Sequence, residues 1–169
     1  MKTLQNHTLI YDKDCPLCNV YTSGFIKTRM MDANGRKPFT ELSEDEKSFI
    51  DSRRACNEIA LINNKDKSVI YGIDSLLAII GNSFPLVQKT GNFAPVRFLL
   101  KKLYSFISYN RKVIIPAGNK NVIQCVPDFN YKYRIAYLIF GIVITALILY
   151  KYSEMITILP QGTFLRELV

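Results

Sequence analysis

The first part of the chain alternates between short apolar runs and stretches in which apolar residues recur at helical spacing. Runs bounded by turn residues predict strands, whereas a helical period that begins at a capping residue or a proline predicts a helix. The predicted strands are residues 8–11, 37–42, 58–62 and 68–71, and the predicted helices are residues 16–31, 43–56, 74–80 and 95–109. This β-α-β-α-β-β-α order, with 95–109 as an extra helix, predicts an α/β, thioredoxin-like domain.

Residues 135–150 differ from the rest because they are apolar all the way around a helix. Sixteen residues rise roughly 24 Å, a little less than a hydrocarbon core of about 30 Å. Aromatic and basic residues that are typical of membrane interfaces flank the segment, namely Tyr131, Lys132, Tyr133, Arg134, Tyr150, Lys151 and Tyr152. The pattern favours a transmembrane helix at 132–152, and a buried core helix is the alternative.

The composition, 49% hydrophobic and 21% charged, excludes a disordered chain. The net charge of +8 lies in residues 86–134, which contain nine basic residues and one acid. A nucleic-acid-binding domain more often spreads its basic residues over a folded face, so the charge favours membrane lipid as a partner and predicts no binding to nucleic acid.

Most of these basic residues precede the apolar segment, and residues 1–14 lack the apolar core of a secretory signal. The positive-inside rule then predicts a single-pass membrane protein whose N-terminal domain is cytoplasmic. We expect a domain at 1–112, a basic juxtamembrane loop at 113–131, the transmembrane helix at 132–152 and a short tail at 153–169.

Two of the four cysteines form the motif Cys15-Pro16-Leu17-Cys18, between the first predicted strand and the first predicted helix. A CxxC in this position is typical of redox-active proteins, because the helix N-terminus stabilises a thiolate. Cys15 is then expected to be the nucleophile, and Cys18 is expected to resolve the mixed disulfide. Asp14 or Cys15 would cap the helix.

Other uses of the cysteines are open at this point. Covalent haem would need a histidine where Asn19 stands. A zinc site usually takes two close pairs of ligands, whereas Cys56 and Cys125 are far apart. A structural CxxC that never cycles is a further alternative. We expect Cys56 to be a small core residue, Cys125 to be a plain thiol, and the chain to hold no cofactor or metal.

Two acids, Asp12 and Asp14, stand next to the motif. A carboxylate near a thiolate raises the thiol pKa, whereas a buried acid could also pass a proton during disulfide exchange. Alternatively, Asp12 ends the strand in a turn and Asp14 caps the helix. The sequence leaves these roles open.

A resemblance to a known family rests on the run YDKDCPLC at residues 11–18. This run resembles the signature of the DCC family of predicted thiol-disulfide oxidoreductases, named for Asp-x-x-Cys-x-x-Cys. Weaker similarities lie at 59–62, 69–76 and 103–111, the last of which resembles the family's closing Tyr-x-x-x-x-x-Asn-Arg helix. The resemblance covers about residues 7–112. It implies a thioredoxin-like domain with redox-active Cys15 and Cys18 and with Asp12 as the motif acid.

The sequence therefore predicts a membrane-anchored thiol-disulfide oxidoreductase that acts on an unidentified protein or a small-molecule thiol or disulfide. The alternative is a membrane-tethered binding or assembly module with a non-cycling CxxC, whose basic stretch binds anionic lipid. A zinc-binding domain is a third interpretation.

Overall fold

The computed structural model describes residues 2–116 and 127–155. The chain divides into two compact units, Met1–Asp128 and Phe129–Val169. Each unit is described by itself below.

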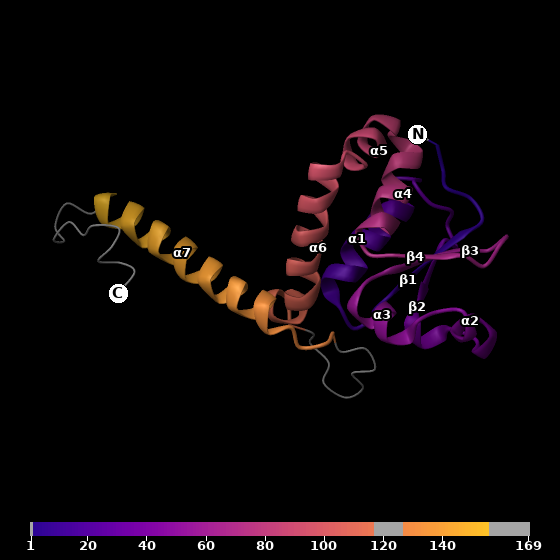
Figure 1. Cartoon of the computed structure of the whole chain (residues 1–169), viewed down its shortest axis with the longest axis horizontal. Helices are drawn as coiled ribbons and strands as arrows, with labels where there is room; N and C mark the ends of the chain where they lie inside the picture. Colours follow the sequence, from indigo (N-terminus) through magenta and orange to yellow (C-terminus); the bar gives the residue numbers. More distant parts are fainter. Residues whose placement is uncertain (1, 117–126, 156–169) are drawn as a thin grey trace. The chain divides into compact units, whose positions relative to one another are not determined.

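The N-terminal unit is built on a four-stranded sheet (Figure 1). Its strands are β1 (His7–Tyr11), β2 (Arg36–Pro38), β3 (Ala60–Asn63) and β4 (Val69–Tyr71). They are ordered β2-β1-β3-β4. β1 pairs in parallel with β2 and antiparallel with β3, and β3 pairs antiparallel with β4. This arrangement confirms the predicted thioredoxin-like α/β fold.

The helices of this unit are α1 (Pro16–Lys27), α2 (Glu44–Ser48), α3 (Ser52–Asn57), α4 (Ile73–Ser83), α5 (Pro85–Gly91) and α6 (Ala94–Ile114), with a 3-10 turn, η1 (Phe39–Glu41). The single helix predicted at 43–56 is wrong, because Asp51 accepts a hydrogen bond from the Arg54 N–H and thereby starts α3 separately. The strand predicted at 37–42 ends early, at Pro38, which has no N–H to donate and leads into η1. Helix α5 was not predicted.

Alternating residues of the central strands fill two cores, one on each face of the sheet. Leu9 and Leu61 pack with Met31, Ile59 and Ile79, beside side chains of α1 and α4. The opposite face packs against the segment from η1 to α3, and its buried residues are Ile10, Leu42, Ile50, Ala55, Ala60 and Ile62. The sheet is therefore covered on both faces, and the turn from β1 to α1 lies at the end of a buried strand.

Two side chains of α6 form hydrogen bonds with the backbone that leads from α3 into β3. The Tyr104 hydroxyl oxygen accepts from the Ile59 N–H at 3.0 Å, and the Ser108 hydroxyl donates to the Asn57 carbonyl. One turn further along, the Arg111 side chain is only 4% exposed. These contacts place the C-terminal half of α6 beside the β1–α1 turn.

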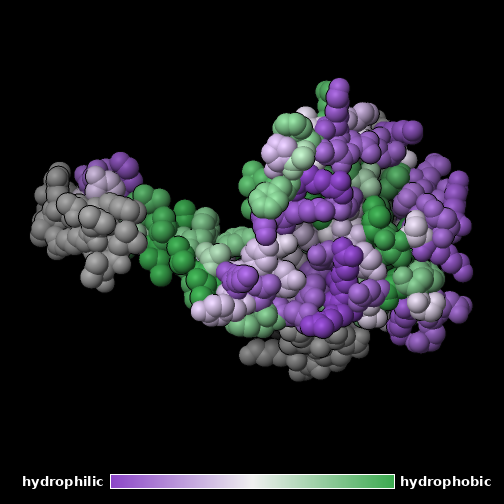
Figure 2. Space-filling model, viewed as in Figure 1, coloured by the Kyte–Doolittle hydropathy of each residue, from purple (hydrophilic) through white to green (hydrophobic). Residues whose placement is uncertain are grey.

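Helix α7 (Tyr131–Met155) belongs to the second unit. Its 25 residues would extend about 37 Å. It is long and apolar enough to cross a membrane by length and composition, and Figure 2 shows its middle part as a hydrophobic surface, with hydrophilic residues at its C-terminal end. The helix is longer at both ends than the predicted segment 132–152.

Candidate active site

The β1–α1 turn is folded by its own backbone and by Asp12. The Asp12 carboxylate accepts a hydrogen bond from the Asp14 N–H at 3.0 Å, and the Asp12 carbonyl accepts one from the Cys15 N–H at 3.2 Å. Asp12 thus closes the turn at the end of β1. Cys15 is the N-cap of α1, because its sulfur accepts from the Cys18 N–H at 3.4 Å. Asp14 does not cap the helix; of the two caps expected, Cys15 is the one observed.

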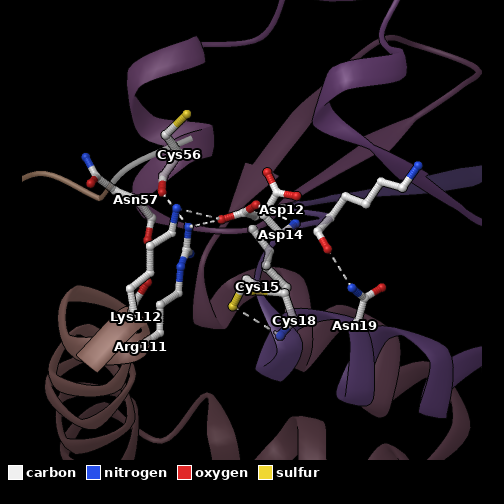
Figure 3. Close-up of polar contacts among 12 residues, drawn as sticks. Asp12, Asp14, Cys15, Cys18, Asn19, Cys56, Asn57, Arg111 and Lys112 are labelled. Atoms are coloured by element: carbon white, nitrogen blue, oxygen red, sulfur yellow. Dashed lines mark hydrogen bonds and ion pairs between the residues drawn. The ribbon is translucent and has the colours of Figure 1, made fainter. Parts of the chain in front are cut away.

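The cysteine pair is buried and reduced. Cys15 and Cys18 are free thiols, each 1% exposed. The Cys15 sulfur accepts a hydrogen bond from the Cys18 N–H at 3.4 Å (Figure 3), and the Cys18 thiol is a second donor that stabilises the Cys15 thiolate. These bonds, together with the positive charge of Arg111, outweigh burial and the charge of Asp12 and lower the pKa of Cys15 from 9.0 to about 6. The thiolate is the nucleophilic form of cysteine, so the two hydrogen-bond donors favour the reactive form of Cys15.

Cys18 has the opposite character. Its thiol donates to Cys15, so losing its proton would break that bond, and burial adds to the cost; both raise the pKa of Cys18. The Tyr21 hydroxyl in turn hydrogen-bonds to the Cys18 sulfur. Burial raises the pKa of Tyr21, so its proton stays in place. The two pKa values therefore shift in opposite directions, so that Cys15 is the thiol of the pair that ionises first.

Asp12 is held by two cations from the end of α6. Its carboxylate lies 3.4 Å from Arg111 Nη2 and 3.5 Å from Lys112 Nζ, and its side chain is 4% exposed. Arg111 also donates to the Cys56 carbonyl at 2.8 Å. Figure 3 shows these groups gathered around the β1–α1 turn. The negative charge of Asp12 raises the pKa of Cys15, and the positive charge of Arg111 beside it lowers the same pKa. The two effects therefore oppose each other.

A cavity of about 280 Å³ opens beside the pair. Its lining is mostly apolar and comes from α1, α4 and α6; the lining residues are Leu17, Cys18, Tyr21, Leu76, Tyr104, Ile107, Ser108 and Arg111. Cys18 lines it and Cys15 does not. Among the described residues, no group of three or more His, Cys, Asp or Glu side chains could hold a metal ion.

A comparison with protein families identifies this arrangement. The family model for DCC1-like thiol-disulfide oxidoreductases matches residues 9–115. The chain belongs to this family. No curated protein and no solved structure gives a match. The matched segment of this DCC1-like chain runs from β1 to the end of α6, so it includes Asp12, both cysteines of the motif and Arg111.

The structure brings the three predicted site residues, Asp12, Cys15 and Cys18, into one turn. Sequence reasoning missed Arg111 and Tyr21 as neighbours of the pair. Tyr21 lies one turn after Cys18, so helical spacing was its available signal. Arg111 stands 99 positions from Asp12, and its only signal was its place in the Asn-Arg pair that resembles the DCC family's closing helix.

The expectation for Cys56 is wrong. Cys56 is disulfide-bonded and only partly buried, whereas it was expected to be a small core residue. Sequence spacing does not reveal pairing between distant cysteines. Cys125, expected to be a plain thiol, lies outside the described residues.

Proposed function

We propose that this DCC1-like protein catalyses thiol-disulfide exchange through Cys15 and Cys18. The proposal rests on the difference between the two thiols. Cys15 has a pKa of about 6 and accepts hydrogen bonds from Cys18, whereas the pKa of Cys18 is raised. At pH 7 such a thiol is ionised by about ten to one. Its partners are thiols or disulfides of a protein or a small molecule.

In the cycle, the Cys15 thiolate attacks a sulfur of the partner disulfide, and the other partner sulfur leaves as a thiolate. Cys18 then loses its proton and attacks Cys15, so that the Cys15–Cys18 disulfide forms and the second partner thiol is released. The reverse sequence oxidises a partner dithiol. Arg111 favours the Cys15 thiolate electrostatically, and Asp12 holds Arg111 in place.

The pH dependence of exchange tests this proposal. The full-length protein with Cys15 and Cys18 reduced is mixed, in detergent, with the small probe hydroxyethyl disulfide, and loss of these two thiols is followed. The rate should rise with pH through about 6 and level off, because the thiolate population saturates there. A Cys18→Ser variant should accumulate the probe as a mixed disulfide on Cys15. A rate that climbs up to pH 9, as for an ordinary thiol, contradicts the proposed thiolate.

A non-cycling pair in a binding module is the second candidate, and it is favoured by the burial of both cysteines, each only 1% exposed. A redox titration separates the two functions. An exchange enzyme should convert reversibly between dithiol and disulfide across the range of physiological glutathione potentials. A pair that stays reduced over that whole range supports the binding module.

We also propose that α7 anchors the domain in a membrane as a single span, with the N-terminal domain on the cytoplasmic side. The length and apolarity of α7 support the anchor, and the basic residues that precede it support the orientation. Disulfides are rare in the cytosol, so the bonded Cys56 argues for the opposite side. Protease protection of the N-terminal domain in sealed membrane vesicles of known orientation decides between the two.

A further inference from the structure

Helix α6 has a row of large apolar side chains that are exposed to solvent. They recur every three or four residues and so lie on one face of the helix; this α6 row consists of Val96, Leu99, Leu103 and Ile107. Each of these residues is between 36% and 66% exposed. Figure 2 shows hydrophobic side chains at the α6 edge of the N-terminal unit. The α6 row is therefore not part of the hydrophobic core.

Two exposed aromatic side chains add to this apolar surface. Phe93, directly before the first residue of α6, is 63% exposed, and Phe98, in the second turn, is 66% exposed. Large exposed apolar areas are uncommon on folded domains and usually mark an interaction surface. The partner that fits this surface can be inferred from the charges around it.

The charges in this part of the chain are all positive. Residues 86–116 contain six basic residues and no acid, and four of the six form ion pairs with Asp74 or Asp12. The other two, Lys89 of α5 and Lys102 of α6, are exposed and form no ion pair within the described part of the chain. Lys102 Nζ lies 5.5 Å from the centre of the Phe98 ring. An uncompensated positive charge therefore lies beside the exposed apolar side chains.

An apolar row with lysines beside it matches the surface of an anionic bilayer. In an interfacial helix the apolar face enters the boundary between headgroups and acyl chains, and the basic residues interact with anionic lipid. The core of a protein–protein interface, by contrast, is depleted of lysine. With five basic residues among its 21 residues, α6 is too polar to cross a bilayer, and it suits the surface instead.

The membrane anchor brings α6 close to lipid. Helix α6 ends at Ile114 and α7 begins at Tyr131, so only residues 115–130 connect the two helices. A surface that is tethered near its partner meets it at a high effective concentration. Even a weak affinity of α6 for lipid is then enough to dock the domain.

We propose that the α6 row docks on the surface of an anionic membrane. The apolar side chains enter the headgroup boundary, and Lys89 and Lys102 interact with the lipid phosphates. The proposal rests on the membrane anchor proposed above and is independent of the exchange chemistry. Since Ile107 also lines the cavity beside Cys18, docking places the mouth of that cavity at the bilayer surface.

Tryptophan fluorescence tests the proposal, because the sequence contains no tryptophan and a single introduced indole reports on its own position. Leu103→Trp places the indole within the α6 row. Ile70→Trp is the matched control, because Ile70 is also an exposed apolar residue, at 39%, and lies on β4. Circular dichroism verifies the fold of each variant, and Leu99→Trp replaces Leu103→Trp if the latter does not fold.

The full-length variants are reconstituted in vesicles of phosphatidylcholine brominated on its acyl chains, with or without phosphatidylglycerol as the anionic lipid. Bromine quenches an indole that contacts the acyl region. Phosphatidylglycerol is present in both leaflets, so the orientation of the protein does not affect the result. Flotation of the vesicles shows separately that the protein is anchored in them.

We expect strong quenching of Leu103→Trp in anionic vesicles and little quenching of Ile70→Trp. In the Leu103→Trp chain, Lys89→Gln together with Lys102→Gln should lower the ratio of docked to undocked protein by up to about 30-fold, since each basic residue at an anionic surface contributes about fivefold. Lys27→Gln together with Lys65→Gln removes the same charge from exposed positions on α1 and on the β3–β4 connection, and should leave the quenching unchanged.

Four results overturn the inference. Leu103→Trp and Ile70→Trp are quenched to the same extent while the protein floats with the vesicles; this outcome leaves the anchor intact. The emission of Leu103→Trp is shifted to the blue but is not quenched, which shows that protein, such as a second copy of the chain, covers the α6 row. The quenching is the same without phosphatidylglycerol and in the Lys89 and Lys102 variant, which refutes recognition of anionic lipid. The protein does not float with the vesicles, in which case the proposed anchor fails as well.

Discussion

Replacing Arg111 by methionine removes a buried cation from Asp12 and from the surroundings of Cys15. The two charged groups are 3.4 Å apart, and both side chains are 4% exposed. Breaking a buried ion pair by removing one partner costs about 3–5 kcal/mol. Lys112 remains 3.5 Å from the same carboxylate oxygen and reduces that cost. Methionine also keeps most of the apolar stem of the side chain.

We therefore expect Arg111→Met to lower the free energy of unfolding by about 2–3 kcal/mol. Urea unfolding of the full-length protein in detergent, followed by far-ultraviolet circular dichroism, measures it. Lys47→Met is the control, because Lys47 forms an ion pair with Glu44 that is 40% and 89% exposed, and its removal should leave the midpoint unchanged.

The same substitution should raise the pKa of Cys15, because Arg111 lowers it in the native protein. A rise of about one unit corresponds to ~1.4 kcal/mol of lost thiolate stabilisation. Asp12→Asn should act in the opposite direction, since the Asp12 charge raises this pKa. Thiolate absorbance in the ultraviolet, titrated with pH, measures both. Shifts of the same sign in the two variants, or none in either, would refute the electrostatic assignment.

Four further outcomes are expected. Cys18→Ala should raise the pKa of Cys15, measured by thiolate absorbance, because it removes the thiol donor that lowers this pKa most. Since the folded pKa of Cys15 is depressed, the unfolding free energy of the reduced protein should fall as the pH drops from about 9 to about 6, and oxidised protein should lack this slope. Tyr104→Phe leaves the Ile59 N–H without its acceptor and should cost about 1–3 kcal/mol in urea unfolding. Gly91→Ala would place a methyl group 2.6 Å from Cδ2 of Leu77 and should lower the free energy of unfolding by about 1–3 kcal/mol in the same assay. An unchanged midpoint would show that the core relaxes freely there.

Sequence patterns predicted those strands and helix ends that depend only on a few neighbouring residues. The strand before the motif and the start of α1 at Pro16 are set by a short apolar run and by a residue that fits the first helical turn. The break between α2 and α3 was missed, because Asp51 acts as a cap inside a stretch whose polar composition also suits one continuous helix. Helix α5 was missed because it is only 7 residues long and directly follows α4.

The candidate site was predictable only where its residues are neighbours in the chain. Asp12, Cys15 and Cys18 lie within one turn, and their spacing predicts their proximity. The contacts of Arg111 with Asp12 and with the Cys56 carbonyl depend on how α6 packs. Nothing in the spacing of these residues encodes that packing, because it results from the whole arrangement of helices around the sheet.

The separation of Asp12 and Arg111 by 99 positions also affects the pKa of Cys15 during synthesis, before the chain is folded. While the polypeptide is being made, Cys15 is present long before α6 has been synthesised, and without Arg111 nearby and the ordered hydrogen bonds of the native turn its thiol has an ordinary pKa of about 8.5. Such a thiol is mostly protonated at neutral pH and reacts slowly. The low pKa of Cys15 is thus a property of the folded domain, and the part of it that Arg111 supplies exists only once α6 has packed beside the β1–α1 turn.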